Sequence, residues 1–254
     1  MRLFRRSAVV AATLIATTTL AGMAPAGGLG EMTDGERQAF RAEVRQYLLD
    51  NPDVLIEAMD ILQARQEQAS ANRDLKLLAD NKAEIYQNPN DWVGGNPQGD
   101  ITLVEFMDYR CGYCRKAFEE TEELVKSDGN IRFVIKEYPI LGEGSLVSSQ
   151  FAIAVRMLHG DAAYKRAHDA LITLKGDATL KAMAALAKDL GLDPAPILAK
   201  MKTPEVLAII EDNHQLAQTL EVNGTPTFIL DRTMVRGYVP LEGMRQIVQG
   251  ERKS

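Results

Sequence analysis

The chain of 254 residues is long enough for one large domain or two small ones. Hydrophobic residues make up 46% and charged residues 25%, which is ordinary globular composition, and the formal net charge of -6 argues against nucleic acid as a partner, because binding its backbone needs a basic surface. Two cysteines and three histidines are too few for a rich Cys/His metal centre or a disulfide-stapled mini-protein.

The N-terminal segment has the layout of an export signal. Three arginines, Arg2, Arg5 and Arg6, precede an uncharged, mostly apolar run over residues 7–20, and the Ala-Pro-Ala at residues 24–26 fits a cleavage site. We therefore expect residues 1–26 to be a cleaved signal peptide and the mature protein to be periplasmic. An uncleaved membrane anchor is the alternative, although the glycines and proline that follow the apolar run make a poor spanning helix.

Residues 27–88 are expected to form an N-terminal helical arm. Apolar periodicity predicts one helix over residues 36–49 and a second from residue 52 to about 87, longer than most globular helices. Leu55, Met59 and Leu62 follow a heptad-like spacing, which favours a homo-oligomer through these helices. The alternative is that the same face packs on the protein's own domain.

The remainder, residues 89–254, alternates strands and helices. A buried strand, a helix and a second strand of this length predict a parallel βαβ unit and thus an α/β fold. A long helical block, a hairpin and a closing helix follow. The expected ranges are strands at 101–106 and 131–136 around a helix at 114–126, helices over about 145–220, a hairpin of 227–230 with 234–237, and a helix at 240–249.

The chemistry of the chain centres on Cys111-Gly112-Tyr113-Cys114, which follows a strand and opens a helix. A zinc site would need about four ligands, and the sequence has no second cysteine pair. A structural disulfide at this spacing would close a very small loop and contribute little stability. A redox pair explains the placement better, because exchange needs one accessible thiolate and a second thiol close by to resolve the mixed disulfide.

The position of Cys111 at a helix start predicts an acidic thiol, since free backbone N–H groups and the helix dipole favour the thiolate. The neighbouring Arg110 and Arg115 add positive charge, whereas no histidine stands between the cysteines. Glu105 interrupts an apolar strand six positions before Cys111. A buried Glu105 would be able to exchange a proton with the pair, but the sequence leaves open whether it is buried or solvated.

The stretch at residues 104–114, together with Gly-Thr-Pro-Thr-Phe at residues 224–228, resembles the DsbA-like family of thioredoxin-fold disulfide oxidoreductases. The resemblance implies a thioredoxin fold with an all-helical insertion at about 145–220. It also implies that Cys111 is the nucleophile, Cys114 the resolving thiol and Glu105 a carboxylate below the disulfide. Thr225-Pro226 would form a cis-proline loop at which substrate binds, with Tyr113, Thr225 and Pro226 as substrate contacts.

Two departures from oxidase-type members bear on function. Gly-Tyr between the cysteines and Thr225 before the proline are a combination seen in DsbC-like isomerases, and the helical arm is similar to the oligomerising extensions of ScsC-like proteins. The resemblance thus predicts a disulfide isomerase or reductase with no metal or organic cofactor. Its expected partners are cysteine-containing exported proteins and a membrane redox partner that resets the pair. A DsbA-type dithiol oxidase and a non-catalytic periplasmic chaperone are the alternatives.

Overall fold

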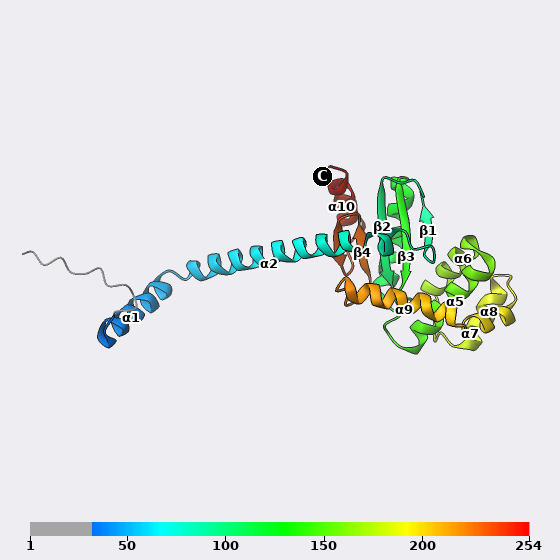
Figure 1. Cartoon of the computed structure of the whole chain (residues 1–254), viewed down its shortest axis with the longest axis horizontal. Helices are drawn as coiled ribbons and strands as arrows, with labels where there is room; N and C mark the ends of the chain where they lie inside the picture. The colour runs from blue at the N-terminus through cyan, green and yellow to red at the C-terminus, as the bar shows by residue number, and fades with distance from the viewer. Residues whose placement is uncertain (1–31, 254) are drawn as a thin grey trace, which may run out of the picture. The chain divides into compact units, whose positions relative to one another are not determined.

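The computed structural model describes residues 32–253 (Figure 1), and this part of the chain divides into two units between Gln63 and Ala64. The first unit contains α1 (Asp34–Asp50) and the beginning of α2 (Asp53–Asp80). The second unit contains the rest of α2 and every later element. The expected signal peptide lies outside the described residues. Within residues 32–253, no helix is both long and apolar enough to cross a membrane.

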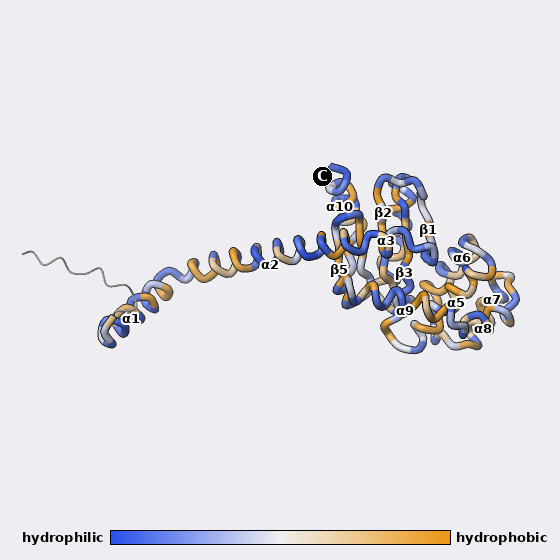
Figure 2. Tube along the Cα trace, in the orientation of Figure 1, coloured by the Kyte–Doolittle hydropathy of each residue, from blue (hydrophilic) through white to orange (hydrophobic). Residues whose placement is uncertain are grey.

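The first unit is helical because its sequence caps α1 well. The Thr33 hydroxyl accepts a hydrogen bond from the Glu36 N–H, and the Glu36 carboxylate accepts one from the Thr33 N–H, which together form a capping box. No residue of α1 is buried. Apolar residues recur along α1 and the first half of α2 (Figure 2). Those more than a third exposed are Phe40, Val44, Tyr47, Leu49, Leu55, Ile56, Met59, Ile61 and Leu62.

The second unit is built on a five-stranded sheet with the order β1-β3-β2-β4-β5. Strands β2 and β3 are parallel, and the β1–β3, β2–β4 and β4–β5 pairs are antiparallel. The bounds of the strands are β1 Trp92–Gly95, β2 Ile101–Met107, β3 Ile131–Glu137, β4 Thr227–Leu230 and β5 Thr233–Arg236. The parallel βαβ unit and the C-terminal hairpin predicted from the sequence are both confirmed.

Helices cover both faces of the sheet. One face packs into a core with α4, α10 and the inserted helices, and the other packs with the end of α2, α3 and α9. The inserted helices α5–α8 gather to one side of the sheet (Figure 1). The helix bounds are α3 Lys82–Tyr86, α4 Gly112–Asp128, α5 Glu143–His159, α6 Asp161–Ile172, α7 Leu180–Asp189, α8 Pro194–Lys200, α9 Pro204–Thr219 and α10 Leu241–Lys253.

The structure differs from the sequence prediction at two places before β2. The single helix expected to reach residue 87 ends at Asp80, because the Asn81 side chain donates to the Leu77 carbonyl at 2.8 Å and α3 begins anew after it. Strand β1 is not among the strands expected from the sequence, since Gly94 and Gly95 have poor strand propensity. The Trp92 ring lies so close to Gly94 that a Cβ there would come within 2.0 Å of it, so a glycine is required in this strand.

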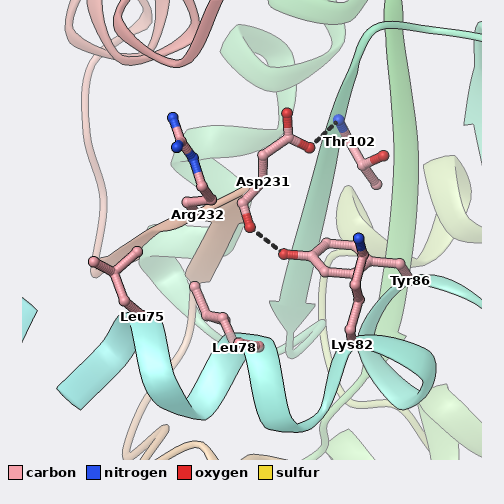
Figure 3. A pocket seen from close by; sticks show the side chains of 8 residues that line it. Leu75, Leu78, Lys82, Tyr86, Thr102, Asp231 and Arg232 are labelled. Carbon is pink, nitrogen blue, oxygen red and sulfur yellow. Dashed lines mark hydrogen bonds between the residues drawn. The ribbon is translucent and has the colours of Figure 1, made fainter. Parts of the chain in front are cut away.

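The turn of the β4–β5 hairpin is anchored to the rest of the second unit. The Asp231 carboxylate accepts a hydrogen bond from the Thr102 N–H at 3.0 Å, and the Tyr86 hydroxyl donates to the Asp231 carbonyl (Figure 3). Leu78 and Ile85 are buried in the same layer. Strand β4, which begins one residue after Pro226, is thereby held beside β2, the strand that leads to the cysteine pair.

Candidate functional site

The cysteine pair lies where β2 gives way to α4. Cys111 is the N-cap of α4 and Cys114 lies in its first turn. Both cysteines are free thiols. Cys111 keeps 8% of its surface exposed, against 1% for Cys114, so Cys111 is the more accessible of the two. This is the geometry expected of a nucleophile and a thiol held in reserve.

The Thr225-Pro226 segment lies against Cys111, although it is far away in sequence. The Cys111 Sγ is 3.1 Å from the Thr225 carbonyl oxygen. The Thr225-Pro226 peptide bond is cis, as the family resemblance implied. Strand β4 follows this bond and pairs with β2, so the sheet itself brings residue 225 to the start of α4.

Hydrogen bonds make Cys111 the ionised member of the pair. They lower the pKa of Cys111 to about 5, with Cys114 the largest contributor, although burial opposes the shift. The Thr225 side chain and the backbone N–H groups of Cys114 and Tyr113 add to the effect. The same Cys111 interaction, together with burial and the nearby Glu105, raises the pKa of Cys114 well above its usual value. At neutral pH, the structure therefore places a thiolate next to a neutral thiol.

The two flanking arginines hold the surrounding loops. Arg115 donates to the Tyr109 and Leu174 carbonyls at 2.8 and 2.9 Å, and Arg110 donates to the Gly176 carbonyl at 2.6 Å. Both guanidinium groups thus tie the cysteine loop to the segment that follows α6.

Glu105 is buried, which settles the question that the sequence left open. It is 6% exposed, and side-chain alternation along β2 puts it on the same face as Leu103 and Met107. Burial, followed by the charges of Glu122 and Cys111, raises the pKa of Glu105 to about 8. A carboxyl group with this pKa is able to take up or release a proton near neutral pH.

Tyr113 forms an aromatic surface with Tyr238, a residue that the sequence analysis did not identify. Tyr113 is 63% exposed, and its ring stacks on that of Tyr238 at 6.3 Å between centroids. The Tyr238 hydroxyl donates to Glu120 at 2.7 Å, and the Lys116 Nζ lies 4.2 Å from the Tyr238 ring centroid. The N–H of Gly237 donates to the Pro226 carbonyl, which keeps this surface next to the cis-proline segment.

Asp108 is a second residue that the sequence analysis did not identify. It is fully buried, and its carboxylate accepts hydrogen bonds from the backbone N–H groups of Arg110, Ile140 and Leu141 at 2.7 to 3.0 Å. Its backbone carbonyl accepts from the Cys111 N–H at 3.1 Å. An aspartate directly after an apolar strand was the available signal, because buried carboxylates of this kind commonly fix loops.

Comparison with known families agrees with this geometry. Residues 102–249 match the DSBA-like thioredoxin domain model, which covers more than half of the chain. The chain belongs to the DsbA-like thioredoxin family. Residues 36–69 match a second model, the copper resistance protein ScsC N-terminal domain. The thioredoxin fold with a helical insertion, predicted from the sequence, is confirmed.

Several solved structures are similar to this DsbA-like chain. A thioredoxin-like oxidoreductase from Silicibacter pomeroyi is 40% identical, with 68% of this chain and 99% of that chain covered and a TM-score of 0.65. BcfH from Salmonella enterica Typhimurium is 25% identical, with 85% and 95% covered and a TM-score of 0.72. The thiol-disulfide exchange protein α-DsbA2 from Wolbachia pipientis is 26% identical, with 72% and 97% covered and a TM-score of 0.66.

The curated relatives are much longer proteins. The Na(+)/H(+) antiporter NhaA from Herminiimonas arsenicoxydans is 23% identical over 164 residues, which make up 64% of this chain and 26% of that protein. A Salinispora arenicola NhaA is 26% identical over 159 residues, or 24% of its length. The chain thus spans about a quarter of the length of the curated relatives it matches.

Proposed function

We propose that this protein is a periplasmic thiol–disulfide oxidoreductase that acts on the cysteines of exported proteins, working chiefly as an isomerase or reductase. The observation that carries the proposal is the ionisation of the pair, with a low pKa at Cys111 and a high one at Cys114. Only a thiolate attacks a disulfide, so this arrangement assigns the first step to Cys111 and leaves Cys114 for the second. Membership of the DsbA-like family supports the same reaction class.

The first step forms a mixed disulfide. The Cys111 thiolate attacks one sulfur of a substrate disulfide, the new S–S bond forms as the substrate bond breaks, and the second substrate sulfur leaves as a thiolate. The polypeptide around the attacked sulfur would lie along Thr225 and Pro226 and against the exposed Tyr113 ring. These contacts hold the substrate while its own thiolate is free to react.

The second step decides between reduction and isomerisation. In reduction, Cys114 gives up its proton and attacks the Cys111 sulfur, the mixed disulfide breaks, and the substrate sulfur leaves as a thiolate. Two electrons have then passed to the substrate, and the pair is a disulfide. The ionised Glu105 carboxyl is suited to accept that proton, because its pKa lies near 8 and its charge acts on Cys114. In isomerisation, another substrate thiolate displaces Cys111, and the pair remains reduced.

Two further features favour isomerisation over oxidation. Thr225 stands before the cis-proline, a feature that resembles the DsbC-like isomerases rather than the oxidase-type members. Apolar side chains on α1 and the beginning of α2 are exposed in the described chain, which supports self-association through the first unit. Several Cys111 sites in one assembly would hold a misfolded chain while its disulfides are exchanged.

The reaction is tested with the mature protein and two substrates. Cys111→Ala should abolish both the reduction of insulin by dithiol and the reactivation of scrambled ribonuclease, whereas Cys114→Ala should abolish reduction but retain part of the isomerisation. Full activity of the Cys111→Ala variant would refute the proposal and favour a chaperone. A wild-type protein that oxidises dithiols rapidly but does not reactivate scrambled ribonuclease would favour the oxidase alternative.

A further inference from the structure

A buried carboxylate lies beneath the cysteine loop and has no role in the exchange steps above. Glu137, the last residue of β3, is 3% exposed. Its Oε1 accepts from the hydroxyls of Tyr109 and Tyr164 at 2.7 and 2.6 Å, and its Oε2 accepts from the Ser149 hydroxyl at 2.7 Å. The three donors come from the cysteine loop, α6 and α5. Glu137 therefore connects the loop before Cys111 to two helices of the insertion.

His168 lies against the Tyr109 hydroxyl. This hydroxyl donates to Glu137 and is 3.1 Å from the His168 Nδ1. Burial lowers the pKa of His168 to about 3, so this ring is neutral at neutral pH. The rings of Tyr164 and His168 stack at 6.0 Å between centroids. Both oxygens of Glu137 and the Tyr109 hydroxyl are thus held by well-packed, hydrogen-bonded groups.

The Tyr109 side chain connects the Glu137 hydrogen bonds to the backbone that precedes Cys111. It is 1% exposed and stands two residues before the cysteine. Its backbone carbonyl accepts from Arg115 in α4, and the Asp108 carbonyl next to it accepts from the Cys111 N–H. A shift of the Tyr109 ring would therefore move the backbone of residues 108 and 109, which accepts hydrogen bonds from the Cys111 N–H and the Arg115 side chain. The hydrogen bonds that hold the Cys111 sulfur weaken steeply as their distances and angles change.

We propose that Tyr109 and Glu137 are positioning residues that hold the Cys111 loop against the helical insertion, so that the sulfur keeps its hydrogen bonds from Cys114 and the start of α4. This inference rests on the proposed function, since it assigns the two residues a role in exchange. They do not touch the substrate or the reacting sulfurs. Their effect passes through the backbone of residues 108–111.

The test compares two variants that each remove one hydroxyl from the same carboxylate. Tyr109→Phe removes the donor on the cysteine loop, and Ser149→Ala removes the donor on α5, which has no direct link to that loop. Both variants should lose stability. Only Tyr109→Phe should raise the pH midpoint of the Cys111 thiolate, by about one unit, or roughly a tenfold change in the thiolate equilibrium. It should also slow the first exchange step with insulin.

Each outcome decides the point. Equal thiolate midpoints in the wild type, Tyr109→Phe and Ser149→Ala would overturn the proposal. The hydrogen bonds to Glu137 would then have a purely structural role. If Tyr109→Phe does not fold, Glu137→Gln takes its place, because it weakens the acceptor of the Tyr109 hydroxyl, and an unchanged midpoint in that variant counts against the proposal in the same way. A wild-type protein without turnover that depends on Cys111 would refute the proposed function. The comparison of thiolate midpoints needs no substrate and would still decide the positioning role.

Discussion

The low pKa of Cys111 depends more on Cys114 than on any other group, which allows a sharp prediction. Replacing Cys114 with alanine removes the leading hydrogen bond to the thiolate, whereas serine keeps a hydroxyl donor of similar size. A hydrogen bond to a charged group contributes about 1.5–3 kcal/mol, which corresponds to about 1–2 pKa units at 1.36 kcal/mol per unit. The Cys111 pKa should therefore rise from about 5 to about 6–7 in Cys114→Ala and change much less in Cys114→Ser.

The assay is the thiolate absorbance of the reduced protein followed against pH, with the rate of alkylation by iodoacetamide as a second readout. Each variant has one cysteine, so the signal belongs to Cys111 alone. If Cys114→Ala titrates at the wild-type midpoint, the backbone N–H groups and Thr225 account for the low pKa and our assignment of the main cause is wrong. A wild-type midpoint at or above about 8.5, the value of an ordinary thiol, would refute the whole electrostatic argument.

Three more predictions follow from the same structure. Thr225→Val should raise the Cys111 pKa, because it removes a side-chain hydrogen bond to the thiolate, whereas Thr225→Ser should not; equal titration curves would rule out this contact. Burial raises the Glu105 pKa to about 8, so its ionisation opposes folding, whereas the low Cys111 pKa contributes the opposite slope. In urea unfolding measured between about pH 4 and pH 8, the free energy of unfolding of the reduced wild type should therefore fall relative to that of Glu105→Gln by on the order of a few kcal/mol, and parallel profiles would contradict the assignment. Deletion of residues 27–63, which ends at the division between the two units and spares the buried Leu78 and Ile85, should convert an oligomer into an active monomer in light scattering. A full mature protein that is already monomeric at micromolar concentration would refute self-association.

The sequence predicted those features of the protein that depend on residues close together in the chain. A cysteine pair at a helix start, an apolar strand before it and a turn between two short strands each depend on contacts within a few residues. For this reason the sheet strands β2 to β5 and the position of Cys111 at the start of α4 were predicted correctly. The expected acidity of Cys111 has the same origin, because backbone N–H groups at a helix start favour a thiolate in any fold.

Tertiary structure decided what depends on distant segments. The sequence does not show whether Glu105 faces water or the core, and only the packing of the core on its face of the sheet buries it and raises its pKa. Strand β1 was not predicted from the sequence because its two glycines have poor strand propensity. Its hydrogen-bonded pairing with β3 makes it a strand. The hydrogen bonds around Glu137 connect Tyr109 in the cysteine loop to Tyr164 and His168 on α6 of the insertion. Burial and long-range hydrogen bonding are properties of the folded chain, so no local pattern reports them.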